Sequence, residues 1–139
     1  MIKRTKKKTK KRVKSPPSIS KLIKKADQLF SLQVRQRGAS PDGYNVCYTC
    51  GHVSLWKKLH CSHYLSRYYK AARWNPDNCR PACYVCNIWK KGDLVRFRQN
   101  LIAEIGEARV LAVEKLRDAP VKLSREFLEE LIQSLQVEI

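Results

Sequence analysis

The chain has 139 residues and a formal net charge of +17, with 29 Lys and Arg residues against 12 Asp and Glu. This length suits one domain with appendages, and no apolar run approaches the roughly 20 residues that span a bilayer, which excludes an integral membrane protein. The first residues lack the apolar segment of an export signal, so we expect a cytoplasmic protein whose six cysteines stay reduced. The excess positive charge predicts a polyanionic partner, because each phosphate that is neutralised releases counterions.

Residues 1–17 are expected to form a disordered basic arm. Nine of the first 14 residues are Lys or Arg and none is acidic, so this segment repels itself and has nothing to bury. Residues 18–37 are predicted to form an amphipathic helix, because apolar residues from Leu22 to Val34 recur at helical spacing before Gly38.

Two cysteine pairs mark the central segment, residues 43–100. Cys47 and Cys50 form the first pair, Cys83 and Cys86 form the second, and 32 residues separate them. Two such pairs supply the four thiolates of a closed tetrahedral site, so we predict a structural Zn²⁺ on these cysteines. Short apolar runs between the pairs indicate short strands, and helical spacing follows the second pair. Positive charge also gathers in this segment, with ten Lys or Arg residues against two acids.

Residues 101–139 are predicted to be helical. Their apolar stripes are interrupted at Gly106 and at Ala119-Pro120, and Ser124 is placed to cap a last helix. We expect these helices to pack on the zinc-stapled core and on the 18–37 helix, or to form a dimer face. The predicted fold class is therefore α+β, with flanking helices around a zinc-stapled core.

The order of residues in the core resembles that of the ββα-metal, or HNH, nucleases, whose cores are treble-clef-like. In those enzymes a histidine lies on the first strand, an asparagine lies in the connecting loop, and a metal-binding side chain opens the helix. Here these residues would be His63, Asn78 and Asn87.

A narrower resemblance rests on four short runs of sequence. They are His60-Cys61-Ser62-His63-Tyr64, Asn78-Cys79-Arg80, Cys83-Tyr84-Val85-Cys86-Asn87 and Gly92-Asp93-Leu94. Together they resemble the NinG/Rap family of phage recombination nucleases, over roughly residues 47–116. The cysteine pairs are also similar to the motif of phage endonuclease VII, a junction resolvase. These resemblances imply a metal-dependent, structure-selective endonuclease that cuts branched DNA such as Holliday junctions and D-loops, in the host cytoplasm if a phage encodes it.

The resemblance also implies roles for single residues. His63 would be the general base, since an imidazole with an ordinary pKa near 6.5 can take a proton from water at neutral pH. Asn87 would be a ligand of a catalytic Mg²⁺ or Mn²⁺, and Asn78 would fix the loop around the base. Many HNH enzymes have Asp or His directly before the base, where this chain has Ser62. His60 shares a strand face with Ser62 and is predicted to supply the missing ligand, a donor set that favours Mn²⁺ and leaves Mg²⁺ open.

Basic residues near this site are predicted to contact DNA phosphates, and aromatic residues between them are predicted to stack on unpaired bases. The basic residues are Arg67, Lys70, Arg73, Arg80, Lys90, Lys91 and Arg96, and the aromatic ones are Tyr68, Tyr69, Trp74 and Trp89.

Several alternatives stay open. Cys61 and Cys79 are most simply small core residues, but they could replace a zinc ligand or form a disulfide. The function could be that of an HNH nicking or homing enzyme, or of a zinc-binding DNA-binding protein without catalysis. A homodimer would suit the two symmetric cuts of a four-way junction, although only that function calls for it.

Overall fold

The computed structural model describes residues 10–137, so the prediction of a disordered arm lies outside the described residues for positions 1–9. Residues 10–17 are exposed and carry no regular secondary structure. The helices and strands are, in chain order, α1 (Ile19–Gln36), β1 (Tyr44–Val46), β2 (Val53–Leu55), β3 (His60–His63), β4 (Cys79–Ala82), α2 (Leu94–Ile105), α3 (Glu107–Lys115) and α4 (Arg125–Val137).

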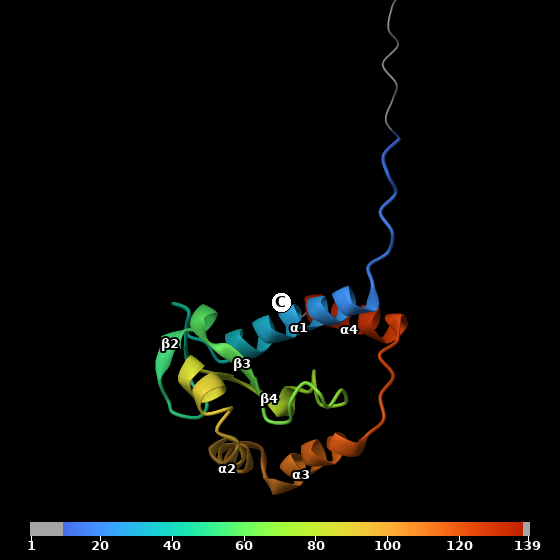
Figure 1. Ribbon diagram of the computed structural model, residues 1–139. Helices are drawn as coiled ribbons and strands as arrows, with labels where there is room; N and C mark the ends of the chain where they lie inside the picture. The colour runs from blue at the N-terminus through green and yellow to red at the C-terminus, as the bar shows by residue number, and fades with distance from the viewer. Residues whose placement is uncertain (1–9, 138–139) are drawn as a thin grey trace, which may run out of the picture.

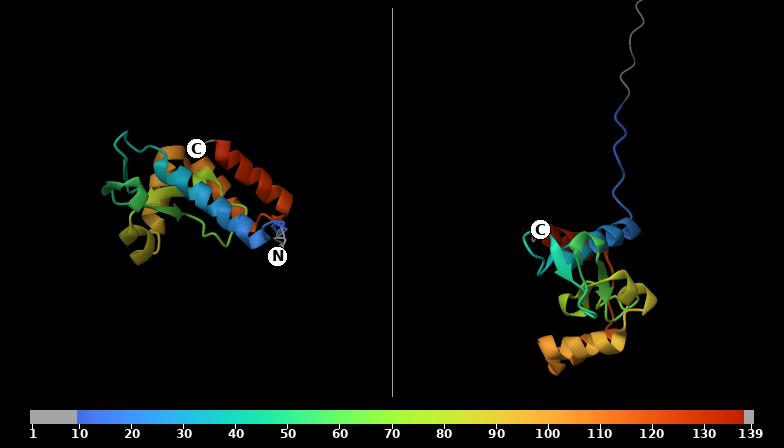
Figure 2. Two further views of the ribbon diagram at one scale, coloured as in Figure 1. Left: turned by 90° about the horizontal axis from the view of Figure 1, so that it is seen from above. Right: turned by 90° about the vertical axis from the view of Figure 1, so that its left-hand side faces the viewer.

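These elements form three layers. Figure 1 shows α1 and α4 along one face, α2 and α3 along the opposite face, and the strands of the central segment between them. Seen from above, α1 and α4 lie side by side (Figure 2), and they share a buried cluster. The α+β class predicted from the sequence is confirmed.

Helix α1 begins and ends as the sequence predicts. Ser18 caps it by accepting a hydrogen bond from the Lys21 amide at 3.3 Å. Gly38, with a φ of 78°, follows its last turn in the left-handed conformation that favours glycine. Its buried residues recur at helical spacing and pack on α4 and the strands: Leu22, Ala26, Phe30 and Val34.

The central segment contains two separate antiparallel pairs of strands, β1 with β2 and β3 with β4. In the second pair, His63 lies opposite Cys79 and His60 lies opposite Ala82. This register brings the predicted base next to one of the two cysteines that the zinc prediction leaves unused.

The segment after β4 differs from the prediction of a regular helix that opens at Asn87. Val85–Trp89 form a single π-helical turn, and the regular helix α2 follows only after a further turn. In that further turn, Lys91, Gly92 and Asp93 have φ values of 50°, 88° and 45°. A left-handed conformation is uncommon for lysine, so this turn is a constrained part of the backbone.

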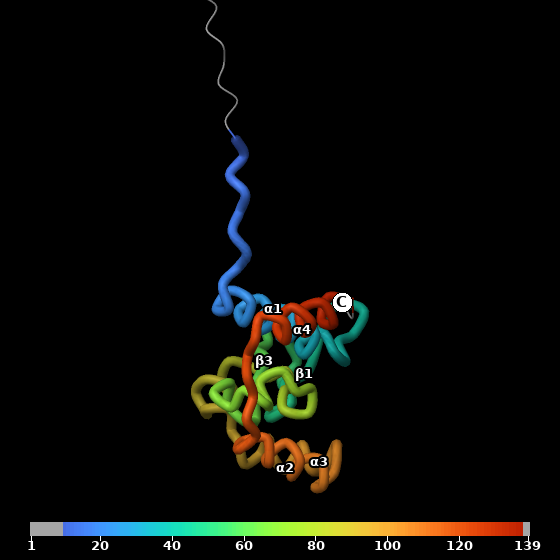
Figure 3. The backbone as a smooth tube through the Cα atoms, turned by 90° about the vertical axis from the view of Figure 1, so that its right-hand side faces the viewer, coloured from blue at the N-terminus to red at the C-terminus, as the bar shows by residue number. Residues whose placement is uncertain are grey.

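Helices α2 and α3 pack against each other. Phe97 and Leu101 on α2 share a buried cluster with Val110 on α3, and Gly106, with a φ of 86°, separates the two helices. The chain then crosses the molecule from α3 to α4 (Figure 3).

Helix α4 completes the layer that α1 begins. Ser124 caps it by accepting a hydrogen bond from the Phe127 amide at 3.1 Å. Leu128 and Ile132 then pack against α1. Within residues 10–137, none of the helices has the length and apolar character needed to cross a membrane.

Candidate functional site

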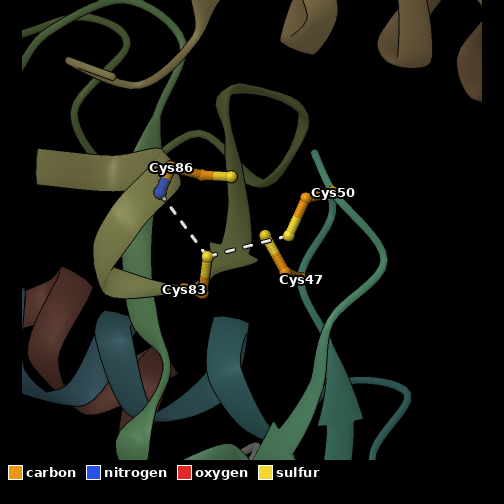
Figure 4. A group of neighbouring side chains, drawn as sticks. All are labelled: Cys47, Cys50, Cys83 and Cys86. Atoms are coloured by element: carbon orange, nitrogen blue, oxygen red, sulfur yellow. Dashed lines mark hydrogen bonds between the residues drawn. The ribbon is translucent and has the colours of Figure 1, made fainter. Parts of the chain in front are cut away.

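The four predicted zinc ligands meet at one point. Cys47 and Cys50 lie on the turn after β1, Cys83 and Cys86 lie on the turn after β4, and their sulfur atoms point toward one another (Figure 4). All four Sγ atoms lie within 4.8 Å of one another, and those of Cys50 and Cys83 are 3.8 Å apart. A tetrahedral zinc with Zn–S bonds of about 2.3 Å requires sulfur atoms about 3.8 Å apart. The cluster therefore has the dimensions of a metal site and could hold an ion such as zinc.

The surroundings of these thiols also suit a cation. Burial opposes ionisation of the Cys47 thiol, but hydrogen bonds from the Cys50 and Cys83 backbone and from the Thr49 hydroxyl outweigh it and lower its pKa to about 6. Burial raises the pKa of the Cys86 thiol to about 12. A bound cation would hold all four sulfurs as thiolates, because the thiolate is the form that ligates metal.

A cleft of about 520 Å³ opens between α1, β3 and the segment after Cys86. His60 and His63 from β3 line it together with Asn87, so three of the predicted catalytic residues reach the same space. The charged side chains among its lining residues are three bases and one acid: Arg35, Arg67, Lys91 and Asp27. The cleft therefore presents imidazole and amide groups in positive surroundings, which suit a polyanion.

His63 is held in one tautomer. Its Nε2 lies 3.0 Å from the carbonyl oxygen of Arg73, and because a carbonyl can only accept, Nε2 carries the proton and Nδ1 keeps its lone pair. Burial is the main cause that lowers the pKa of His63, and the positive charge of Arg67 lowers it further. The imidazole is therefore neutral near pH 7, with one nitrogen free to accept a proton.

Asp27 of α1 anchors the loop that orients His63, and sequence reasoning did not find it. Its carboxylate accepts hydrogen bonds from Arg73 Nε and Trp74 Nε1, both at 2.9 Å. The carbonyl of Arg73 is the group that holds His63. The feature of the sequence that marks Asp27 is that it is the only acidic residue in α1 and directly follows the buried Ala26.

His60 and Asn87 lie in contact, with His60 Nδ1 3.1 Å from Asn87 Nδ2. Tyr84 packs edge-on against the His60 ring, with the ring centroids 5.9 Å apart, which limits the orientations of the imidazole. The amide nitrogen of Asn87 can only donate, so His60 Nδ1 accepts this hydrogen bond, and His60 Nε2 and Asn87 Oδ1 are the atoms left that could bind an ion. Ser62, by contrast, is only 1% exposed and could not take the place of a metal ligand in the cleft.

Asn78 is fully buried and ties together the loop between β3 and β4. Its Oδ1 accepts from the Leu65 amide at 2.7 Å, and its Nδ2 donates to the carbonyl oxygens of Leu65 and Ala72 at 2.9 and 3.1 Å. These hydrogen bonds go to no lining residue of the cleft, so the side chain acts by shaping the backbone beside His63.

We expect Asn78→Ala to lower the free energy of unfolding by about 3 kcal/mol, because it leaves the buried amide and carbonyl of Leu65 without partners. The fold should survive at low temperature, with the loop around His63 loosened. Chemical denaturation measures the change. Asn75→Ala is the matched control, since Asn75 makes one local hydrogen bond, to the Asp77 amide at 2.9 Å, and should cost less. Equal losses in both variants would contradict the role given to Asn78.

Cys61 and Cys79 lie beside His63. Their Sγ atoms and one ring nitrogen of His63 lie within 4.8 Å of one another. Cys79 is fully buried, as the prediction of a core residue requires, and Cys61 is half-buried and lines the cleft. Burial and the neighbouring Cys61 raise the pKa of the Cys79 thiol well above its usual value. Neither cysteine reaches the four-cysteine cluster, so replacement of a zinc ligand by either one is not supported.

Two of the seven residues predicted to contact phosphates are largely withdrawn from the surface. The Arg80 side chain is 7% exposed, with Nε 3.1 Å from Glu104 Oε2 and Nη1 2.7 Å from the Pro76 carbonyl oxygen. Arg73 binds Asp27 and is 19% exposed. The prediction for Arg80 is therefore corrected, since it is a structural residue, and Arg73 serves the loop. The other five side chains are at the surface: Arg67, Lys70, Lys90, Lys91 and Arg96.

Comparison with known proteins supports the NinG part of the resemblance in the sequence. The chain is 35% identical over 95 residues to the protein named Protein ninG from Escherichia phage lambda. This match covers 66% of the chain and 43% of the relative, so the chain aligns with less than half of that protein's length. No solved structure matches the chain. The family model described as Bacteriophage Lambda NinG protein matches residues 1–139, and the chain therefore belongs to the NinG family.

Proposed function

We propose that this protein is a metal-dependent endonuclease of the HNH type that cuts branched DNA. The observation that carries the proposal is the gathering of His60, His63 and Asn87 in one basic cleft, with the Nδ1 of His63 left free by the hydrogen bond from Nε2 to Arg73. A protein that only binds DNA has no need of a histidine held neutral and in one tautomer at the floor of its binding surface.

His63 acts in this proposal as the general base that takes a proton from the attacking water. His60 and Asn87 would hold a divalent ion, which when bound supplies the positive charge that orients the scissile phosphate and stabilises its leaving oxygen. Their donor set fits Mn²⁺ well and fits Mg²⁺ with water completing its shell. Arg67 and Lys91, on the wall of the cleft, bind the phosphates on either side of the scissile one.

Exposed aromatic side chains that neighbour these Arg and Lys residues support selectivity for branched DNA. Tyr68 is 84% exposed beside Arg67, and Trp89 is 74% exposed beside Lys90 and Lys91. Unpaired bases at a branch can stack on such rings, whereas the bases of an intact duplex are already stacked on each other. The five exposed Arg and Lys residues contact the DNA phosphate backbone and do not read the base sequence.

A cleavage assay tests the proposal. Purified protein is incubated with a synthetic four-way junction and, separately, with a linear duplex of the same sequence. Each DNA is offered with Mg²⁺, with Mn²⁺ and with a chelator that removes these ions but leaves the four-cysteine site loaded. We expect cleavage of the junction that depends on the added ion. Binding of both DNAs with no cleavage by a folded, zinc-loaded protein would reject the enzyme in favour of a DNA-binding protein. Equal cutting of both DNAs would reject branch selectivity alone.

We expect deletion of residues 1–14 to weaken DNA binding and to flatten its dependence on salt. The deleted segment carries nine Lys or Arg residues, and each phosphate contact contributes about 0.9 to the slope of log K against log salt. Fluorescence anisotropy of a labelled junction over a salt series measures both quantities, and cleavage at low salt should persist. A slope unchanged by the deletion would show that the arm makes no phosphate contacts.

A further inference from the structure

Cys61 and Cys79 form a third group of potential metal ligands with His63, and the proposed nuclease chemistry uses neither thiol. The two Sγ atoms and a ring nitrogen of His63 lie within 4.8 Å of one another. The pairing of β3 with β4 brings them together, because His63 lies opposite Cys79 and Cys61 is two residues from His63 on the same strand face. Two thiols and an imidazole are the donors that zinc and other soft ions prefer.

The geometry is close to that of a three-ligand zinc site. Bonds of about 2.0 to 2.3 Å place the donors of a tetrahedral ion about 3.4 to 3.8 Å apart, so the group needs to contract by at most about 1.4 Å. The Nε2 of His63 already donates to the Arg73 carbonyl oxygen, which is how the second nitrogen of a ligating histidine is commonly held. Nδ1 is then the nitrogen that can bind an ion.

The surroundings of the group give it a closed side and an open side. Phe30, Val34 and Leu135 pack with the buried Cys79 and exclude water there. Cys61 and His63 line the cleft on the other side. A fourth ligand position would therefore face the cleft, and an ion has a path to it from solvent.

We propose that Cys61, His63 and Cys79 form an inhibitory site for a thiophilic divalent ion such as Zn²⁺, separate from the four-cysteine cluster and from the His60–Asn87 pair. Binding releases the two thiol protons to solvent and places the ion on the lone pair of His63. The imidazole can then no longer accept a proton from water. The inhibitory role rests on the proposed nuclease function, whereas metal binding at the site does not.

Metal binding is tested first, without DNA. The full chain, reduced and carrying about one zinc at its four cysteines, is dialysed against Co²⁺, and the metals are counted and the absorption spectrum recorded. We expect one further ion per chain in the wild type that gives sulfur-to-cobalt charge-transfer bands, whereas an ion on His60 and Asn87 has no sulfur ligand and gives none. Cys61→Ser should lower the affinity for this second ion at least about 100-fold, since removing even a residue that only hydrogen-bonds to a metal ligand lowers metal affinity 10- to 100-fold.

Two further variants make this result decisive. His52→Ala removes an exposed histidine away from the group and should bind the second ion like the wild type. Cys79→Ala removes the buried thiol, and circular dichroism checks that it folds. The site is rejected if the wild type takes up no second ion, or if Cys61→Ser and Cys79→Ala both bind it normally.

The inhibitory role is tested by the ratio of junction cleavage rates with and without one further equivalent of Zn²⁺, in excess Mg²⁺. We expect the wild-type rate to fall at least about tenfold, because the base is blocked, and the Cys61→Ser ratio to stay near one. Equal inhibition of the two proteins would overturn the inhibitory role. If the wild type cuts no DNA, the proposed function fails, and the metal count still decides whether the site exists.

Discussion

His63→Ala should bind a four-way junction as tightly as the wild type and cut it at least about 100-fold more slowly, since a positioned general base contributes roughly 10²- to 10⁴-fold. Binding should persist because the exposed Arg and Lys residues are unchanged. His63 itself carries no charge near pH 7, because burial lowers its pKa. Anisotropy measures binding, and single-turnover cleavage with excess protein measures the chemical step. A loss confined to affinity would contradict the role of the base.

Two controls separate a base from a residue that merely supports the fold. His52→Ala removes a histidine that is exposed and lies outside the cleft lining, so it should cut at the wild-type rate. Imidazole added to His63→Ala should restore part of the cleavage, because the deleted ring leaves room for a diffusible base beside the Arg73 carbonyl. Rescue that also appears with a non-basic solute of the same size would point to packing instead.

The parts of the fold that the sequence predicted well are those with local signals. The ends of α1 and α4 follow from Ser18 and Ser124 as caps and from the glycine after α1. The four-cysteine cluster follows from the spacing within each pair, because a two-residue gap places both sulfurs on one turn. Each of these features depends on a few neighbouring residues, which a sequence displays directly.

The parts that it missed depend on contacts between distant segments. Asp27 reaches Arg73, 46 residues further along the chain, only because α1 packs across β3 and β4. Arg80 looked like a surface base, but the strand that carries it is buried on both faces and Glu104 of α2 compensates its charge. The π-helical turn at Asn87 depends on the left-handed residues that follow it, which composition alone does not reveal.

We expect Cys86→Ser to lose the bound zinc and to unfold the central segment. Structural zinc contributes an apparent free energy of about 10 to 16 kcal/mol, as much as or more than the roughly 5 to 15 kcal/mol that stabilises an ordinary domain. The region has little else to hold it, because the buried cluster at this point consists of Cys47, Ala82 and Cys86, with Cys83 packed against it. The β1–β2 pair adds little buried apolar surface, since Val46 and Val53 are 47% and 58% exposed.

Zinc content and thermal unfolding followed by circular dichroism measure this effect. Cys61→Ser is the matched control, because it makes the same chemical change outside the four-cysteine cluster and should keep about one zinc per chain and a near-normal melting temperature. A strong zinc chelator should reproduce the Cys86→Ser result in the wild type, with refolding when zinc is returned. A Cys86→Ser protein that melts like the wild type would show that no metal on these cysteines stabilises the fold. Asn87 directly follows Cys86 and contacts His60, so we expect the loss of zinc also to separate these two residues of the cleft.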